Sequence, residues 1–158
     1  IEDLSLSSAL KSFIPPPSGR TRIINTEHIK IIDDTYNSNP LAVKSIIDTM
    51  VKHFPDNRKI LVLGDMLELG EEEITAHSKA GEWAREYGID YLFTFGPLGC
   101  HTVKAASGAG TESFPFQEKS SLIKELLNII KPGDVILVKG SRGMHMEEIV
   151  ESLLDRVK

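Results

Sequence analysis

The chain has 158 residues, enough for one domain and a short additional segment; 41% are hydrophobic and 26% are charged, as in ordinary globular proteins. The formal net charge of −5 argues against a general nucleic-acid-binding surface, and no run of about 18 apolar residues predicts a membrane span. The single cysteine, Cys100, cannot form an internal disulfide, which fits a cytoplasmic protein.

The first segment predicts a boundary between two domains. Apolar residues recur at near-helical spacing over residues 4–13, and residues 15–17 are three consecutive prolines, which favour a stiff, extended connector. The chain also lacks an initiator methionine. We therefore expect residues 1–17 to be the remnant and linker of a preceding domain, and residues 18–158 to form the domain itself.

From residue 18 onward, short apolar strands alternate with amphipathic helices. The run Ile60–Leu63 is uniformly apolar, as in strands buried on both faces of a sheet. The helix over residues 40–54 carries one apolar stripe and ends before Pro55. Because such alternation implies parallel crossovers, we predict an α/β fold: a Rossmann-like, doubly wound, mostly parallel sheet with helices on both faces. In chain order we expect strands at 22–24 and 30–32 (paired with each other), 60–63, 91–95, 114–116 and 135–138, and helices at 40–54, 75–87, 98–107, 118–130 and 145–157.

The octapeptide at residues 33–40, D-D-T-Y-N-S-N-P, joins an apolar strand to a helix start. Asn39 is a favourable N-cap, and Pro40 suits the first helical turn. A turn selected only for capping needs these two residues but not Asp34 or Tyr36. Since open α/β sheets bind ligands at the carboxyl ends of their strands, the octapeptide predicts a binding loop.

Other strand ends carry similar loops, at residues 64–70, 96–97 and 139–143. Glycines there allow close approach of a ligand, and acids, Lys and Arg supply directional contacts, so this edge predicts a pocket for a charged ligand. A tight strand-to-helix turn at 139–143 and solvated charges at 64–70 remain the alternatives. His77 is interpreted as a structural histidine, with a cap or a ligand contact as the alternative. The sequence contains no G-x-x-x-x-G-K-[ST], no G-x-G-x-x-G, no zinc-ligand spacing and no G-x-S-x-G.

Four motifs occur in an order that resembles the C-terminal domain of the Mur ligase family. They are Gly19-Arg20 after the prolines, Ile32–Pro40, Leu61–Gly70 and Val138–Met144. The similarity is strongest to the branch that adds D-alanyl-D-alanine, and it covers about residues 5–158.

The resemblance implies an ATP- and Mg²⁺-dependent, cytoplasmic ligase of peptidoglycan synthesis that joins D-alanyl-D-alanine to a UDP-N-acetylmuramoyl tripeptide. Such ligases have a UDP-binding domain, a central domain with the phosphate loop and the Mg²⁺ ligands, and a last domain that binds the amino component and closes over ATP. Only the last resembles this chain. We therefore expect the chain to be inactive alone, to hold no metal itself, and to depend on the two other domains.

The resemblance also implies roles for individual residues. Arg20 is expected to contact the γ-phosphate of ATP, since a guanidinium suits bidentate phosphate contact, and a solvated linker residue is the alternative. The expected ATP contacts are Asp34 at the ribose and Tyr36, Asn37 and Asn39 at the adenine. The expected contacts to the dipeptide are Lys139, Ser141 and Arg142, assisted by Asp65 and Glu68.

Two alternatives remain open. The chain could be a free-standing Rossmann-like module that binds a nucleotide or a carboxylate. It could also be the C-terminal domain of a folylpolyglutamate-type ligase, but a D-G-A-H-N-P loop is expected there, and Tyr36–Pro40 fits it less well.

Overall fold

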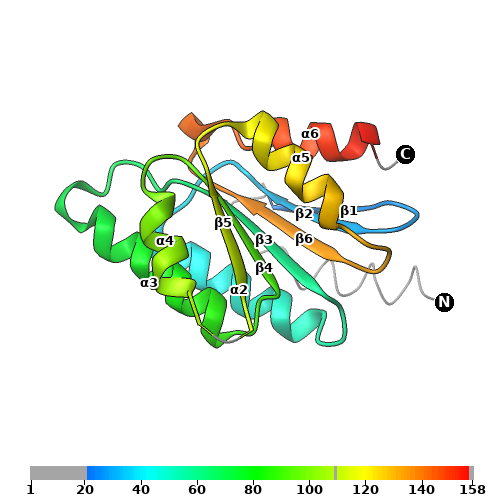
Figure 1. Cartoon of the computed structure of the whole chain (residues 1–158), viewed down its shortest axis with the longest axis horizontal. Coiled ribbons are helices and arrows are strands. Elements are labelled where there is room, and N and C mark those ends of the chain that lie inside the picture. Colours follow the sequence, from blue (N-terminus) through cyan, green and yellow to red (C-terminus); the bar gives the residue numbers. More distant parts are fainter. Residues whose placement is uncertain (1–20, 109, 157–158) are drawn as a thin grey trace.

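A computed structural model describes residues 21–108 and 110–156, which form one α/β unit around a six-stranded sheet (Figure 1). The predicted helix at 4–13, the proline linker, the boundary after residue 17 and Arg20 lie outside the described residues. The strands are β1 (Arg22–Asn25), β2 (Lys30–Asp34), β3 (Lys59–Gly64), β4 (Tyr91–Phe95), β5 (Glu112–Phe116) and β6 (Val135–Lys139).

The strand order in the sheet is β1-β2-β6-β3-β4-β5. All neighbours are parallel except β1 and β2, which form an antiparallel pair at one edge. The mostly parallel sheet and the pairing of its first two strands are thus confirmed. Because β6 is inserted between β2 and β3, the loops that follow these three strands are neighbours in space.

The centre of the sheet is buried on both faces. Every residue of β3 and of β6 is buried, as their apolar sequences predict. At the far edge lies β5, which contains Pro115. A proline has no N–H to donate, so an edge strand, which needs pairing on one side only, accommodates it.

Helices cover both faces (Figure 1). One face carries α2 (Pro40–His53) and α3 (Glu73–Glu86), with α4 (Gly99–Ala106) beside α3. The opposite face carries α5 (Lys119–Ile129) and α6 (Glu147–Arg156). Two apolar cores result, one on each side. Gly81 allows the close approach of α3 to α4, because a Cβ atom there would lie 2.1 Å from the carbonyl oxygen of Thr102.

Helix boundaries differ from the predictions by a few residues, for local reasons. Asn39 caps α2 by accepting the N–H of Ala42, and Pro40 occupies the first turn, as predicted. Short 3-10 turns precede two helices: η1 (Gly70–Glu72) before α3, and η2 (Arg142–Met144) before α6. The acidic residues of η1 lie at the start of α3, where the helix dipole favours negative charge.

Candidate functional site

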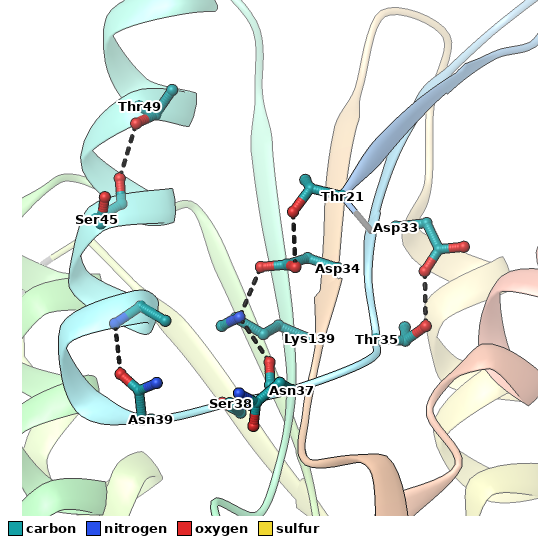
Figure 2. A network of polar contacts seen from close by, with 11 residues as sticks. Thr21, Asp33, Asp34, Thr35, Asn37, Ser38, Asn39, Ser45, Thr49 and Lys139 are labelled. Atoms are coloured by element: carbon teal, nitrogen blue, oxygen red, sulfur yellow. Dashed lines mark hydrogen bonds and ion pairs between the residues drawn. The ribbon is translucent and has the colours of Figure 1, made fainter. Parts of the chain in front are cut away.

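An ion pair between neighbouring strands stands at the centre of the loops (Figure 2). Asp34 and Lys139 are register partners at the ends of β2 and β6, and Lys139 Nζ lies 2.6 Å from Asp34 Oδ2. The Lys139 side chain is 2% exposed and that of Asp34 is 14% exposed. Thr21, immediately before β1, donates its hydroxyl to Asp34 Oδ1 at 2.8 Å. The pair therefore ties three strands together at their ends.

The same ammonium group holds the octapeptide loop in place. Lys139 Nζ donates a second hydrogen bond, of 2.9 Å, to the backbone oxygen of Asn37. The Asn37 side chain in turn accepts the N–H of Ser38 at 2.9 Å. Two residues later Asn39 caps α2. The loop between β2 and α2 is therefore held at Asn37, by the hydrogen bond from Lys139, and at Asn39, by the helix cap.

The loop after β3 is bonded to the loop after β6. Ser141 Oγ accepts the backbone N–H of Leu67 at 2.9 Å, and the N–H of Ser141 donates to the Asp65 carbonyl at 3.3 Å. Ser141 is buried, with 8% exposure. These two bonds fix the relative position of residues 64–70 and 139–143.

Arg142, in the loop after β6, contacts Tyr36 in the octapeptide loop after β2. Its Nη1 donates to the Tyr36 hydroxyl at 3.0 Å, and its guanidinium carbon lies 5.0 Å from the centre of the Tyr36 ring. Both side chains are exposed. A surface pocket of about 390 Å³ lies here, lined by Asp33, Thr35, Tyr36, Arg142 and Glu147. Its lining thus includes an aromatic ring, a cation and two carboxylates.

The two acids of the 64–70 loop differ in environment. Asp65 is 3% exposed, and its Oδ2 accepts the N–H of Leu98 at 3.2 Å. Burial raises the pKa of the Asp65 carboxyl, and the bond from Leu98 opposes part of that increase. Glu68 is exposed and has a left-handed backbone, with φ of 63°. Only Glu68 therefore presents its carboxylate to solvent.

A family model described as "Mur ligase, glutamate ligase domain" matches residues 19–142, most of the chain. The chain belongs to this family.

Several curated relatives of this Mur ligase domain share one name. The "UDP-N-acetylmuramoyl-tripeptide--D-alanyl-D-alanine ligase" of Bacillus subtilis (strain 168) is 37% identical over 139 residues, which cover 86% of this chain and 30% of the relative. The Escherichia coli (strain K12) protein of the same name is 38% identical over 129 residues, 80% of this chain and 27% of the relative. The chain thus spans less than a third of the length of these relatives.

Solved structures agree with the Mur ligase assignment. The chain is similar to MurF from Acinetobacter baumannii, with a TM-score of 0.78 and 25% identity, over 90% of this chain and 31% of that one. It is also similar to MurF ligase from Thermotoga maritima in complex with ADP, with a TM-score of 0.74 and 28% identity, over 88% of this chain and 31% of that one. A domain from a putative Haemophilus ducreyi ligase has the same fold at 21% identity (TM-score 0.63; 83% of this chain, 93% of that one). That chain therefore consists almost entirely of the matched fold.

The structure brings together three of the four strand-end loops that the sequence singled out, at residues 33–39, 64–70 and 139–143. Asp34, Tyr36 and Asn37 meet Lys139 and Arg142 there through the bonds already described. The ligand contacts expected of all nine described site residues stay predictions, as does that of Arg20, which is outside the described residues.

Sequence reasoning missed several residues of this region. Thr21 holds Asp34, Glu147 lines the pocket, and Thr94, at 1% exposure, lies in a buried polar group with Asp65 and His77. The interpretation of His77 as a structural histidine agrees with its position, because it is buried on the face of α3 that carries Ala76 and Ala80. Over residues 21–108 and 110–156 the structure contains no group of three or more His, Cys, Asp or Glu that could hold a metal ion. No helix in this part of the chain has both the length and the apolar character needed to cross a membrane.

Proposed function

We propose that the chain is the domain of a UDP-N-acetylmuramoyl-tripeptide--D-alanyl-D-alanine ligase that binds the incoming dipeptide and closes over ATP. The observation that carries this proposal is the junction of the loops at 33–39, 64–70 and 139–143, with exposed Arg142 and Tyr36 beside a pocket. The names of the relatives supply the substrates. In this proposal residues 1–17 lead in from a preceding domain, and the reaction takes place in the cytoplasm.

The reaction needs cations and oriented donors because negative charge accumulates in it. A carboxylate oxygen of the tripeptide attacks the γ-phosphorus of ATP, and ADP leaves, which gives an acyl phosphate. The amine of D-alanyl-D-alanine then attacks the acyl carbon and loses a proton, and phosphate leaves. Bound Mg²⁺ would supply positive charge that neutralises the phosphates. Its ligands are expected outside residues 21–156.

Arg142 is the described cation best placed to hold the carboxylate of the dipeptide. It is exposed at the pocket, and its planar guanidinium can form two parallel hydrogen bonds to a carboxylate. Ser141, the preceding residue, fixes the loop from which Arg142 extends through its bonds to Asp65 and Leu67. Exposed Glu68 can face the amine of the dipeptide. Asp65 is turned inward, so its contribution to the dipeptide site is to hold the loop.

The nucleotide is proposed to lie on the octapeptide loop. The ring of Tyr36 offers a stacking face to adenine, with exposed Asn37 and Asn39 beside it. Both oxygens of Asp34 already accept one hydrogen bond, so a ribose hydroxyl would use their remaining lone pairs. Lys139, buried and bonded twice, orients Asp34 and this loop, whereas its direct contact with the dipeptide stays a prediction.

A domain graft tests the proposal. The matching domain of the B. subtilis relative is replaced by residues 18–158, giving a grafted ligase with both other domains present. We expect it to release phosphate from ATP only when UDP-N-acetylmuramoyl tripeptide and D-alanyl-D-alanine are both supplied. A folded graft that binds nucleotide but forms no product with the dipeptide argues against the proposal, and product with L-glutamate instead favours the folylpolyglutamate-type alternative.

Titration of the chain alone separates a ligase domain from a free-standing binding module. The phosphate loop expected in the central domain is absent from this sequence. We therefore expect ATP to bind the isolated chain in the millimolar range or not measurably by calorimetry. Tight binding, in the low micromolar range, favours the module.

A further inference from the structure

A buried polar group lies under the 64–70 loop, apart from the surface pocket. It consists of Asp65 from the loop, His77 from α3 and Thr94 from β4, which are 3%, 3% and 1% exposed and together line a cavity of about 10 Å³. None of the three lines the pocket between Tyr36 and Arg142. Their influence on a ligand therefore has to pass through the backbone that they hold.

Both ring nitrogens of His77 bond to backbone groups. Nδ1 lies 2.6 Å from the carbonyl oxygen of Glu73, and Nε2 lies 3.0 Å from the backbone nitrogen of Met66. A carbonyl can only accept and an amide N–H can only donate, so Nδ1 carries the proton and Nε2 accepts. Asp65 Oδ1, 3.8 Å from Nε2, is too far for a hydrogen bond to the ring. The geometry fixes a neutral, Nδ1-protonated ring.

The Met66 bond lies next to the contacts that join the loop at residues 64–70 to the loop at residues 139–143. Asp65, before Met66, accepts the N–H of Ser141, and Leu67, after it, donates to Ser141 Oγ. His77 therefore anchors the middle residue of a three-residue segment whose outer residues both bond to Ser141. The anchor itself is rigid, because the first turn of α3 holds the other side of the ring.

We propose that His77 is a positioning residue: through Met66 it keeps the 64–70 loop in register with Ser141 and Arg142, where the dipeptide carboxylate binds. This inference rests on the proposed function. It differs from a purely structural role of His77, which predicts an effect on stability but none on the affinity of a correctly folded enzyme for the dipeptide.

Two matched substitutions separate the two ring bonds. In His77→Gln the side-chain oxygen reaches the position of Nε2 and can accept the Met66 N–H. In His77→Asn the shorter amide reaches only the position of Nδ1, so it can donate to the carbonyl oxygen of Glu73 but cannot accept the N–H of Met66. Both variants remove the same imidazole from the core, so a difference between them reports on the Met66 bond.

The first measurement uses the isolated chain. Amide hydrogen exchange by NMR should show Met66 and Leu67 exchanging about tenfold faster in His77→Asn than in His77→Gln, as expected for loss of one hydrogen bond. In the unsubstituted chain, nitrogen-15 spectra of the His77 ring at neutral pH should show a protonated Nδ1 and a bare Nε2. A protonated Nε2 overturns the inference even if neither variant folds.

The second measurement uses the grafted ligase. We expect His77→Asn to raise KM for D-alanyl-D-alanine about tenfold with a small change in kcat, and His77→Gln to restore KM to within about threefold. Equal KM values in the two variants overturn the positioning role even if the exchange rates differ. An inactive unsubstituted graft counts against the proposed function instead, and the exchange and ring spectra then still decide whether His77 holds Met66.

Discussion

Lys139→Met should destabilise the domain strongly because it leaves a mostly buried carboxylate without its cation. The lysine is 2% exposed, its partner Asp34 is 14% exposed, and their atoms are 2.6 Å apart. Removing one member of a buried ion pair costs about 3–5 kcal/mol, and we expect about 3 kcal/mol here because Asp34 keeps some solvent contact and the Thr21 bond.

A double-mutant cycle assigns this cost to the pair. Asp34→Asn alone leaves the buried Lys139 ammonium without its anion and should lower the unfolding free energy by a similar amount. The double variant removes both charges, so it should be more stable than the sum of the two single losses predicts, by at least about 1 kcal/mol. Lys124→Met, at an exposed position of α5, removes a lysine without a buried partner and serves as the control.

Urea unfolding at neutral pH, followed by far-ultraviolet circular dichroism, gives the four unfolding free energies. A loss below about 1 kcal/mol for Lys139→Met, or strict additivity of the two single variants, would refute the reasoning that the pair is buried and coupled. A larger m-value in Lys139→Met would indicate a change in the compactness of one state rather than the loss of this contact alone.

Substitutions at three further positions test local features. Burial raises the pKa of Asp65, so at pH values just above the ordinary 3.8 the folded state keeps a proton that the unfolded state has released. The contribution of Asp65 to the unfolding free energy therefore falls as the pH rises above 3.8. Asp65→Asn should remove that decrease, so the stability of the variant relative to the parent should rise from pH 4 to pH 7 in urea titrations; parallel pH profiles would contradict this. Glu68→Gly should be more stable than Glu68→Ala by about 1 kcal/mol in thermal unfolding, since φ is 63° there, and equal stabilities would count against the left-handed backbone. Asn39→Ala should cost about 1 kcal/mol through loss of the α2 cap, whereas Asn39→Asp should cost little; an equal loss in both would show that the cap contributes nothing.

The sheet and its helices could be predicted because local signals agreed with the global fold. Uniformly apolar runs became the central strands β3 and β6, and Asn39 with Pro40 marked the start of α2. The rule that ligands bind at strand carboxyl ends was enough to select the loops that the structure brings together.

The internal partners of the site residues could not be read from the sequence. Lys139 bonds to Asp34 across 105 positions, because β6 is inserted between β2 and β3, and alternating strands and helices do not specify that order. Asp65 and Glu68 looked alike as loop acids. Their opposite orientations depend on the Leu98 bond and on the left-handed backbone at Glu68, neither of which has a local sequence signal.

The most direct test compares Arg142→Ala with Lys124→Ala in the grafted ligase. Each removes one exposed cation beside a surface pocket, but Lys124 lies in a pocket on α5 and α6, away from the three loops. We predict that Arg142→Ala raises KM for D-alanyl-D-alanine by about tenfold to hundredfold, the loss of a hydrogen bond to a charged group, and that Lys124→Ala leaves it unchanged. Equal KM values in the two variants would contradict the claim that the three loops form the dipeptide's half of a ligase active site.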